Sequence, residues 1–589
     1  MSQKKNSELE VGALSTVVGG GTMWLSGVVG AQLHDVAASV AGAAQYAPLA
    51  SGLSAGMFGL GAVMTTWGVT TLGRRLSPRG RARAKFQNPG WANWRQLRKH
   101  LSAGAALRTA RFTRESYQHI TWWNQAWATR KMTPTEHAIY VGKSVVGPEY
   151  ARELYVSYKD VVLIIAPPQT GKTAFLCGTI IDAPGAVIAT STKHDIHAYT
   201  HALRTNGDRP VLLFNPEHVG GIDSTFAWDP TSGCADPDVA QRRADALVQG
   251  TRAGQGVENG GFFESQAAKV LRALLMAAAL EKRGMRQVAA WVADGADQAE
   301  RVLRNHREVP HNWVNELNQV LRSPERTRES IFLTISLAVA FMSNPRVAAI
   351  CTPSDADSQF DLGDFIDRRG TLYLLGEGRM IAPLITALTS YLFDGAKAHA
   401  SLQPNGRLDP PTTFALDEAA LIVPVDLDRW VSDAGGRNIC IMIAAQSLSQ
   451  LFKTWGERGG ETIKNNANLE MYFGGLSVAS DMEAISALCG EYETPTVSET
   501  HANGGRRNST TTAKTWRKTL TVDQLRELPD HHVLVLYRNS RPTIARTRPV
   551  WERRDVKRVR KAEKRAKNAK LPTQRTATDQ PDDTASEQP

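Results

Sequence analysis

Apolar and polar residues divide this chain into three kinds of segment. Residues 11–33 and 36–73 contain no charged side chain. Short apolar runs then alternate with helical stretches, and residues 238–341 are helical in pattern almost throughout. We therefore expect a membrane-spanning part, an alternating α/β part and a helical part.

The two uncharged stretches are long enough to cross a membrane, which takes about 20 apolar residues. We expect one span near 11–33 and a second near 48–72. Lys4 and Lys5 precede the first, the loop between them has no Lys or Arg, and six Lys/Arg follow in residues 74–85. The positive-inside rule then places both ends of the chain in the cytoplasm. The alternative is a Gly/Ala-rich soluble helical hairpin.

Six short apolar runs predict the strands of a doubly wound α/β sheet. They lie at 161–165, 186–190, 211–214, 371–375, 412–416 and 439–444. Between the third and the fourth, strong apolar helices are expected at 267–280 and 329–342, with no strand pattern to interrupt them. The helical stretch is therefore expected to be an all-α subdomain inserted in the α/β domain.

These patterns predict six segments along the chain. They are an N-terminal membrane domain (1–73), a basic juxtamembrane region (74–135), the first part of the nucleotide-binding α/β domain (136–237), the inserted all-α subdomain (238–345), the second part of the α/β domain (346–551), and a basic, then low-complexity disordered tail (552–589).

Composition limits where a nucleic acid would bind. The net charge of the 589 residues is +11, but residues 74–111 hold eleven Lys/Arg and no acid, and residues 552–570 hold ten Lys/Arg against three acids. The remainder is therefore net acidic, so the central body is not a generally basic nucleic-acid surface. The five cysteines show no CxxC pairing, which disfavours a zinc site or disulfide framework.

The strand expected at 161–165 runs into a phosphate-binding loop. The eight residues after it are Ala166, Pro167, Pro168, Gln169, Thr170, Gly171, Lys172 and Thr173, and an apolar helix follows. This order of strand, loop and helix is the context of a Walker A motif. Lys172 is expected to bind the β/γ-phosphates of ATP, and the Thr173 hydroxyl to bind Mg²⁺. The alternative is a chance Gly-Lys-Thr at a helix start.

The strand expected at 412–416 ends in Asp417 and Glu418, as a Walker B strand does. Asp417 is expected to hold Mg²⁺ through water, and Glu418 to orient and deprotonate the attacking water. Alternatively, the acids cap the strand on the surface. Gln446 ends the strand expected at 439–444 and would sense the γ-phosphate, unless it is only a polar strand end.

Arg429 and Arg437 lie between these two strands in the sequence. In a ring, either would be able to reach the γ-phosphate of a neighbouring subunit as an arginine finger. Each is equally compatible with a surface ion pair. We expect Arg437 to be the catalytic one.

Over residues 11–550 the chain resembles the type IV coupling proteins of conjugation, the TraG/TraD group of the FtsK-like translocases. The resemblance rests on the two apolar stretches, the 166–173 loop, Ser-Thr-Lys at 191–193, Leu-Asp-Glu-Ala at 416–419, Ala-Gly-Gly-Arg at 434–437, Ala-Gln-Ser-Leu-Ser-Gln-Leu at 445–451, Asn-Asn-Ala-Asn at 465–468, Gly-Gly at 474–475 and Leu-Arg-Glu-Leu-Pro-Asp-His-His-Val-Leu-Val at 525–535. This family often has Gly or Ala at the position of Ala166.

The resemblance implies a RecA-like P-loop ATPase anchored in the bacterial inner membrane. It implies ATP and Mg²⁺ as cofactors and a homo-hexamer as the active form. The implied partners are single-stranded DNA carrying its relaxase, components of the type IV secretion channel, and membrane lipids. The implied activity is ATP hydrolysis that drives the DNA–relaxase substrate toward that channel.

Two other functions are compatible with the same motifs. One is a double-stranded DNA translocase of the chromosome-segregation type, although the low-complexity tail has no room for the C-terminal winged helix of that group. The other is a docking scaffold in which ATP binding only gates assembly. Two further expectations concern surfaces: the tryptophans of residues 89–132 pack under the main domain or anchor at a bilayer, and residues 501–518 form a flexible basic loop.

Overall fold

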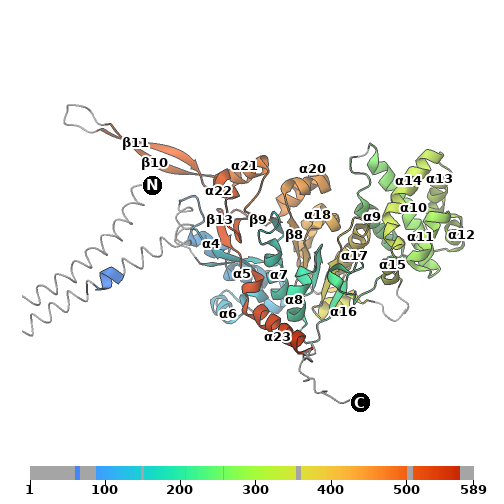
Figure 1. The fold of residues 1–589 in the computed structure, drawn as a ribbon, viewed down its shortest axis with the longest axis horizontal. Helices are drawn as coiled ribbons and strands as arrows, with labels where there is room; N and C mark the ends of the chain where they lie inside the picture. The colour runs from blue at the N-terminus through green and yellow to red at the C-terminus, as the bar shows by residue number, and fades with distance from the viewer. Residues whose placement is uncertain are drawn as a thin grey trace, which may run out of the picture. The chain divides into compact units, whose positions relative to one another are not determined.

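The computed structural model describes residues 60, 62–66, 88–146, 151–205, 207–256, 258–352, 360–500 and 509–570. The chain divides into two compact units, one of residues 1–89 with 145–150 and one of residues 90–144 with 151–589. Every helix and strand described below belongs to the second unit, which is drawn as the coloured ribbon from α4 onward in Figure 1.

An eleven-stranded mixed sheet forms the centre of this unit, with the order β2-β1-β13-β12-β9-β3-β8-β7-β4-β6-β5. The seven strands from β9 to β5 are parallel. Their bounds are β9 (Leu469–Phe473), β3 (Val162–Ile165), β8 (Ile439–Ala445), β7 (Thr412–Leu416), β4 (Val187–Ser191), β6 (Thr371–Leu375) and β5 (Val211–Phe214). The predicted α/β class is confirmed, and all six predicted strands are among these seven.

The strand order determines which loops meet. β8 lies between β3 and β7 and is hydrogen-bonded to both. The carboxyl ends of parallel strands lie at one edge of a sheet, where ligands of open α/β sheets bind. The segments after β3, β7 and β8, which carry the predicted motifs, therefore meet at that edge although up to 280 residues separate them in the sequence.

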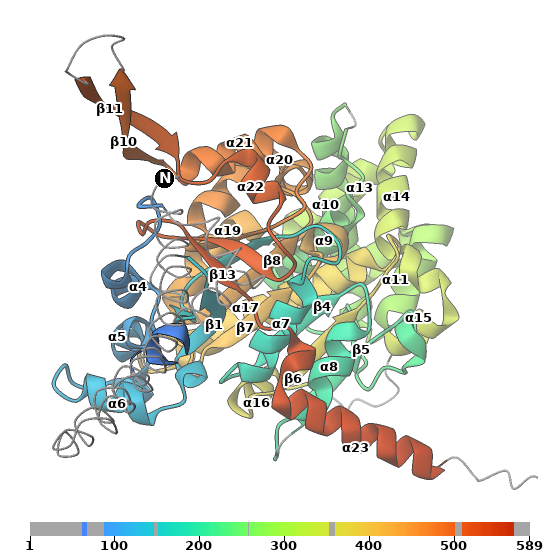
Figure 2. The ribbon, with the colours of Figure 1, turned by 60° about the vertical axis from the view of Figure 1, so that its left-hand side comes forward.

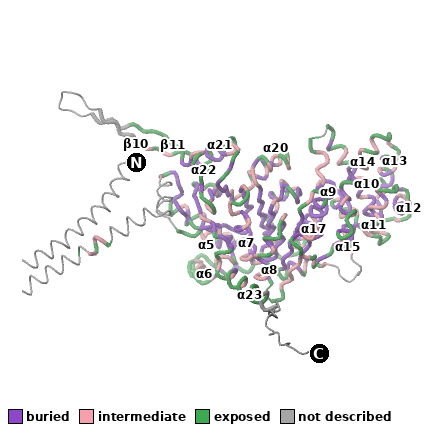
Figure 3. The backbone as a smooth tube through the Cα atoms, in the orientation of Figure 1, coloured by how far each residue is buried: buried purple, intermediate pink, exposed green. Residues whose placement is uncertain are grey.

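Helices cover both faces of the parallel strands, and these strands are buried except at Val211 and Leu212 of β5 and Glu470 of β9, which are half-buried. The buried residues gather in the interior of the unit (Figure 3). On one face, α7 (Lys172–Asp182) and α8 (Asp195–Arg204) pack over the sheet, and the Thr200 hydroxyl lies 2.6 Å from the Tyr373 hydroxyl. On the other face, Phe414 of β7 contacts Phe393 of α17 (Ala382–Leu402), whose ring stacks on Trp430 of α19 (Leu427–Asp433). Burial on both faces explains why each strand reads as a continuous apolar run.

Every described element between β5 and β6 is a helix. The main ones are α9 (Pro237–Thr251), α10 (Gly260–Leu280), α11 (Gly284–Asp294), α12 (Asp297–Asn305), α13 (His311–Leu321), α14 (Glu325–Val339), α15 (Pro345–Ile350) and α16 (Leu362–Asp367). Helices α10 to α14 gather beside the sheet (Figure 1). α9 packs against α17 as well as against α10, so it connects the helical group to the sheet.

The other edge of the sheet is antiparallel and was not predicted. β12 (His532–Tyr537) pairs with β9, and β13 (Thr543–Arg546), β1 (Ala138–Ser144) and β2 (Glu153–Ser157) extend the sheet in turn. Beside this edge lie α4 (Trp94–His100), α5 (Ala103–Thr113) and α6 (Gln125–Lys131). The remaining helices are α18 (Ala419–Ile422), α20 (Leu448–Asn466), α21 (Ala479–Leu488), α22 (Val522–Arg526) and α23 (Arg554–Lys570); α23 extends from the body in Figure 2.

One surface expectation, the loop at 501–518, is wrong for the residues that the structure describes, which leave out 501–508. Residues 509–518 do not form a loop, because they are strand β11 (Ser509–Lys518), which pairs with β10 (Glu491–Thr500) in a separate two-stranded sheet. The tryptophans expected to pack under the main domain or to anchor at a bilayer differ from one another: Trp91 is buried, whereas Trp94, Trp122, Trp123 and Trp127 are exposed.

The predicted membrane localisation is contradicted. The part of the chain that the structure describes has no helix both long and apolar enough to cross a bilayer. Its longest apolar helices, α10 and α17, carry charged side chains and pack against neighbouring helices. The predicted span at 11–33 lies outside the described residues, and of the span at 48–72 only residues 60 and 62–66 are described. The described residues therefore do not support the predicted inner-membrane localisation with two spans.

Candidate functional site

The loop from Ala166 to Gly171 connects β3 to α7 as the Walker A pattern requires. Gly171 precedes α7 with φ 112°, a conformation that a side chain would strain, and Gln169 also has a positive φ of 65°. Ala166 has no positive φ and is buried, with its N–H donated to the Ala445 carbonyl at 3.0 Å. Alanine at this position, where the Walker A pattern has glycine, therefore causes no backbone strain.

The rest of the loop is open to the surface at its middle. Pro168 and Gln169 are exposed, whereas Pro167 and Thr170 are half-buried. The Thr170 hydroxyl donates to the Pro167 carbonyl at 2.8 Å and closes the turn. Thr173 is the second residue of α7 and is half-buried, so its hydroxyl lies in the first turn of the helix that faces the loop.

Lys172 lies between the two predicted Walker B acids. Its ammonium nitrogen is 3.1 Å from Asp417 Oδ1 and forms a short hydrogen bond with Glu418 Oε1. All three side chains are largely buried, with exposed fractions of 9%, 6% and 12% for Lys172, Asp417 and Glu418. Glu418 has a φ of 51° at the N-cap of α18, and a strained non-glycine residue of this kind is typical of functional sites.

Burial and the neighbouring charges both shift the pKa values of Asp417 and Lys172. Burial raises the pKa of Asp417, and the charge of Glu418 adds to that effect, against the attraction of Lys172. Burial disfavours the charged form of Lys172, but Asp417 and Glu418 together outweigh it and raise the pKa of the lysine. The lysine therefore stays protonated, and its charge holds two neighbouring acids in a buried position.

Gln446 joins the same cluster from the end of β8. Its side-chain amide donates to both oxygens of Glu418, at 3.3 and 3.2 Å, and its own N–H donates to Gln450 Oε1 at 2.9 Å. Helix α20, which begins two residues later, is capped by the Ser447 hydroxyl. The amide of Gln446 is thus placed where it orients the carboxylate of Glu418.

His531 is a member of this site that sequence reasoning did not assign. Its N–H donates to the Thr170 carbonyl at 3.3 Å, and its ring lies so close to Gly171 that a Cβ there would come within 2.5 Å of Nδ1. Burial lowers the pKa of His531. The only sequence signal was its place in the 525–535 motif, which carried no role for an individual residue.

The structure does not bring Arg437 into the site. Arg437 lies in the turn before β8, at the opposite end of that strand from Gln446, and seven strand residues separate the two by about 23 Å. Its guanidinium pairs with Asp433 at 3.2 Å and donates to the Ser401 hydroxyl at 2.7 Å. Arg429 is exposed and pairs with Asp426 at 3.7 Å.

The chemistry of the cluster fits a nucleotide phosphate with a divalent cation. Asp417 Oδ1 is buried, and its partner among the described residues is the Lys172 ammonium at 3.1 Å, so this oxygen keeps a second lone pair for a cation or for a water bound to it. Within those residues, no group of three or more His, Cys, Asp or Glu is arranged to hold a metal alone. This sparse set matches Mg²⁺, which keeps several waters and takes other ligands from phosphates.

This chain is similar to conjugative coupling proteins in part of its sequence and in its fold. A family model described as "TraM recognition site of TraD and TraG" matches residues 411–530, and no curated protein matches the chain. Among solved structures, the chain is similar to the bacterial conjugative coupling protein TrwBdeltaN70 in its unbound form, with a TM-score of 0.50, 15% identity, and coverage of 66% of this chain and 85% of that one. The plasmid coupling protein TrwB in complex with ADP and Mg²⁺ matches with a TM-score of 0.49, 15% identity, and coverage of 67% and 85%.

These matches support two conclusions. The likeness to TrwBdeltaN70 shows the fold. The family match spans Asp417, Glu418 and Gln446 and confirms the resemblance to type IV coupling proteins that the motifs indicated.

Proposed function

We propose that this chain, whose residues 411–530 match the TraG/TraD family, is the ATPase of a conjugative coupling system. It would use ATP hydrolysis to move single-stranded DNA with its relaxase toward a type IV secretion channel. The observation that carries the proposal is the convergence of Lys172, Asp417, Glu418 and Gln446 at the carboxyl edge of β3, β7 and β8.

The side chains suggest a division of labour. Lys172 binds the phosphates, and in doing so exchanges its pairing with Glu418 for the more strongly charged ligand. Released from the lysine, Glu418 orients the attacking water and accepts its proton. Gln446 keeps the carboxylate of Glu418 in position. Thr173 and Asp417 hold Mg²⁺, which neutralises charge on the phosphates.

The relatives support the nature of the ligands and partners. TrwB has been solved with ADP and Mg²⁺, and the matched family is described by its recognition of TraM. By analogy, we propose ATP and Mg²⁺ as cofactors, a relaxase-bound single strand as substrate, a TraM-like protein bound within 411–530 as an accessory partner, and a homo-hexamer as the active form. Arg437 would act only across a subunit boundary of that hexamer.

The test compares ATP hydrolysis by the full chain and two site variants, with and without single-stranded DNA. Lys172→Ala is expected to lose ATP binding and hydrolysis together. Glu418→Gln is expected to bind ATP but to hydrolyse it about 10² to 10⁴ times more slowly, because the general base is lost. Lys453→Ala and Glu457→Gln, on the exposed face of α20, are matched controls that should retain wild-type activity.

ATP turnover, measured with single-stranded and with duplex DNA at several salt concentrations, distinguishes the proposed motor from the alternative functions. Stimulation by single-stranded DNA that weakens steeply with salt is expected if the DNA backbone is bound. Normal DNA-stimulated turnover in Glu418→Gln would overturn the site assignment. Binding of ATP without turnover under all these conditions would favour the docking scaffold, and stimulation by duplex DNA alone would favour the double-stranded translocase.

A further inference from the structure

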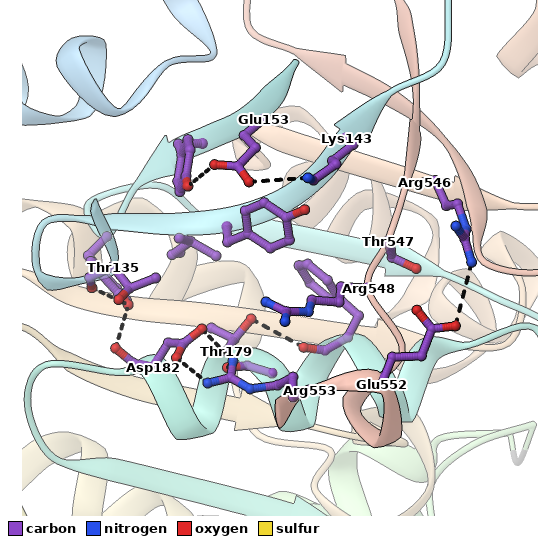
Figure 4. Close-up of a pocket in the computed structure, with 16 residues that line it drawn as sticks. Thr135, Lys143, Glu153, Thr179, Asp182, Arg546, Thr547, Arg548, Glu552 and Arg553 are labelled. Atoms are coloured by element: carbon purple, nitrogen blue, oxygen red, sulfur yellow. Dashed lines mark hydrogen bonds and ion pairs between the residues drawn. The ribbon is translucent and has the colours of Figure 1, made fainter. Parts of the chain in front are cut away.

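A second pocket lies behind the phosphate-loop helix, away from the loop itself. It has a volume of about 560 Å³, within the range of small-molecule sites. Its walls are the β1–β2 hairpin, the outward face of α7 around Thr179, and the segment from Arg546 to Arg553 that follows β13. Figure 4 shows these polar side chains converging on one space.

The charged groups of this pocket are nearly balanced in pairs. Arg553 forms a two-point ion pair with Asp182, at 2.7 and 2.8 Å. The other two pairs are Lys143 with Glu153 at 3.5 Å, and Arg546 with Glu552 at 3.6 Å. Arg553 also pairs with Asp555, which lies outside the pocket lining, at 2.7 Å.

Arg548 is the exception. Among the charged residues that line the pocket, it alone has no hydrogen bond or ion pair with the residues the structure describes. Figure 4 shows its guanidinium reaching into the middle of the pocket, beside Thr179, and Tyr140 also lines this pocket. Arg548 is therefore the cation of this lining without a charged partner among the described residues, and a guanidinium is suited to binding planar oxyanions.

We propose that this pocket binds a small organic anion. Its phosphate or carboxylate group would bind the guanidinium of Arg548, and its hydroxyl groups would form hydrogen bonds with the side chains of Thr179 and Tyr140. A guanidinium offers such a head two parallel hydrogen bonds. Tyr140 and Tyr155 lie edge to face with centroids 5.5 Å apart and give the ligand body an aromatic wall. Burial, with the charge of Glu153, raises the pKa of Tyr140 to about 12, so its hydroxyl is a donor at neutral pH.

Hydrogen bonds through Thr547 and His531 connect the pocket to the phosphate loop. Thr547, next to Arg548, donates both its N–H (2.8 Å) and its hydroxyl (3.2 Å) to the His531 carbonyl. His531 in turn donates its N–H to Thr170 and packs against Gly171. A ligand that fixes Arg548 therefore also restrains the wall of the nucleotide site, and we infer that the pocket regulates nucleotide binding.

Binding is tested with the full chain in thermal denaturation. The probes are ribose 5-phosphate and gluconate, which separate a phosphate from a carboxylate head, and ribose is the neutral control. At about ten times Kd, the preferred anion should raise Tm by about 2 °C, and ribose should not. Arg548→Glu should abolish the shift, whereas Arg554→Glu, the same charge change on an exposed residue outside the pocket, should retain it. No shift with either anion, or an equal shift in Arg548→Glu, overturns the proposal.

Regulation is tested by the affinity for ADP with and without the preferred anion. Because coupling between sites is reciprocal and typically 5- to 150-fold, a change of about 5-fold or more is expected in the wild type and none in Arg548→Glu. Equal ADP affinity in both conditions overturns the regulatory link. The regulatory step rests on the proposed nucleotide site, but the thermal assay does not. Binding of the anion through Arg548, together with a lack of ATP hydrolysis, would therefore refute the proposed function but still support the anion-binding pocket.

Discussion

Removing the charge of Lys172 should destabilise the protein in a pH-dependent way. In Lys172→Met, Asp417 and Glu418 remain adjacent and buried without their counter-charge. Breaking a buried ion pair by removing one partner costs about 3 to 5 kcal/mol. The three side chains are each at least 88% buried, so solvent screening reduces this cost little, and we expect the free energy of unfolding at neutral pH to fall by about that amount.

The pH dependence follows from the pKa of Asp417. That pKa is already raised by burial in the wild type, and losing the attraction of Lys172 raises it further. A carboxyl whose folded pKa exceeds its unfolded value binds more protons when folded, so stability rises as the pH falls. The difference between Lys172→Met and wild type should therefore be largest at about pH 7.5 and shrink toward about pH 5.

The measurement is denaturant unfolding of both proteins at the two pH values, without nucleotide. The double variant Lys172→Met/Asp417→Asn serves as the control, because it removes one of the stranded charges and should recover part of the loss. A stability loss that is the same at both pH values, or no loss at neutral pH, would refute the arrangement of charges described for the site.

Three further outcomes are expected. Gln446→Ala should lower kcat for ATP about 10²-fold with little change in KM, because the amide positions the catalytic carboxylate and not the nucleotide; a change in KM alone would contradict this. Gly171→Ala should weaken ATP binding in a titration, since its φ of 112° and the adjacent histidine ring leave no room for a Cβ, whereas Gly178→Ala in α7 meets no atom within 4 Å and should stabilise the helix by up to about 1 kcal/mol. Arg553→Ala should lower the free energy of unfolding by about 1.5 to 3 kcal/mol, measured by denaturant titration, because the largely buried ion pair with Asp182 is lost; an unchanged value would mean that the pair is not formed in solution.

Several strands and the start of one helix could be predicted because short stretches of sequence determine them. A parallel strand covered by helices on both faces is a nearly continuous apolar run, and β5, β6 and β7 were predicted with the bounds that the structure has. The start of α7 at Lys172 was equally clear, since Gly171 directly precedes it. The antiparallel strands β1, β2 and β13 and the parallel strand β9 were missed because polar or charged residues interrupt the apolar run in each of them.

The tryptophans illustrate the opposite case. Trp91 is buried and Trp122, Trp123 and Trp127 are exposed, although all four lie in the same basic, aromatic stretch. A tryptophan carries no sequence signal for the direction its ring faces, and only the packing around α4 to α6 decides it. The membrane prediction rested on the length of two uncharged stretches and on the positive charges that flank them, and the described helices give it no support.

The sequence by itself determined the chemistry of the site, because the identities of Lys172, Asp417, Glu418 and Gln446, and their places at a helix start or after a strand, are local properties. The tertiary structure decided how that chemistry is assembled. Only the insertion of β8 between β3 and β7 brings Gln446 onto Glu418, and only the pairing of β12 with β9 brings His531 against Gly171. Strand order and pairing depend on contacts between residues hundreds of positions apart, and no local pattern along the chain encodes them.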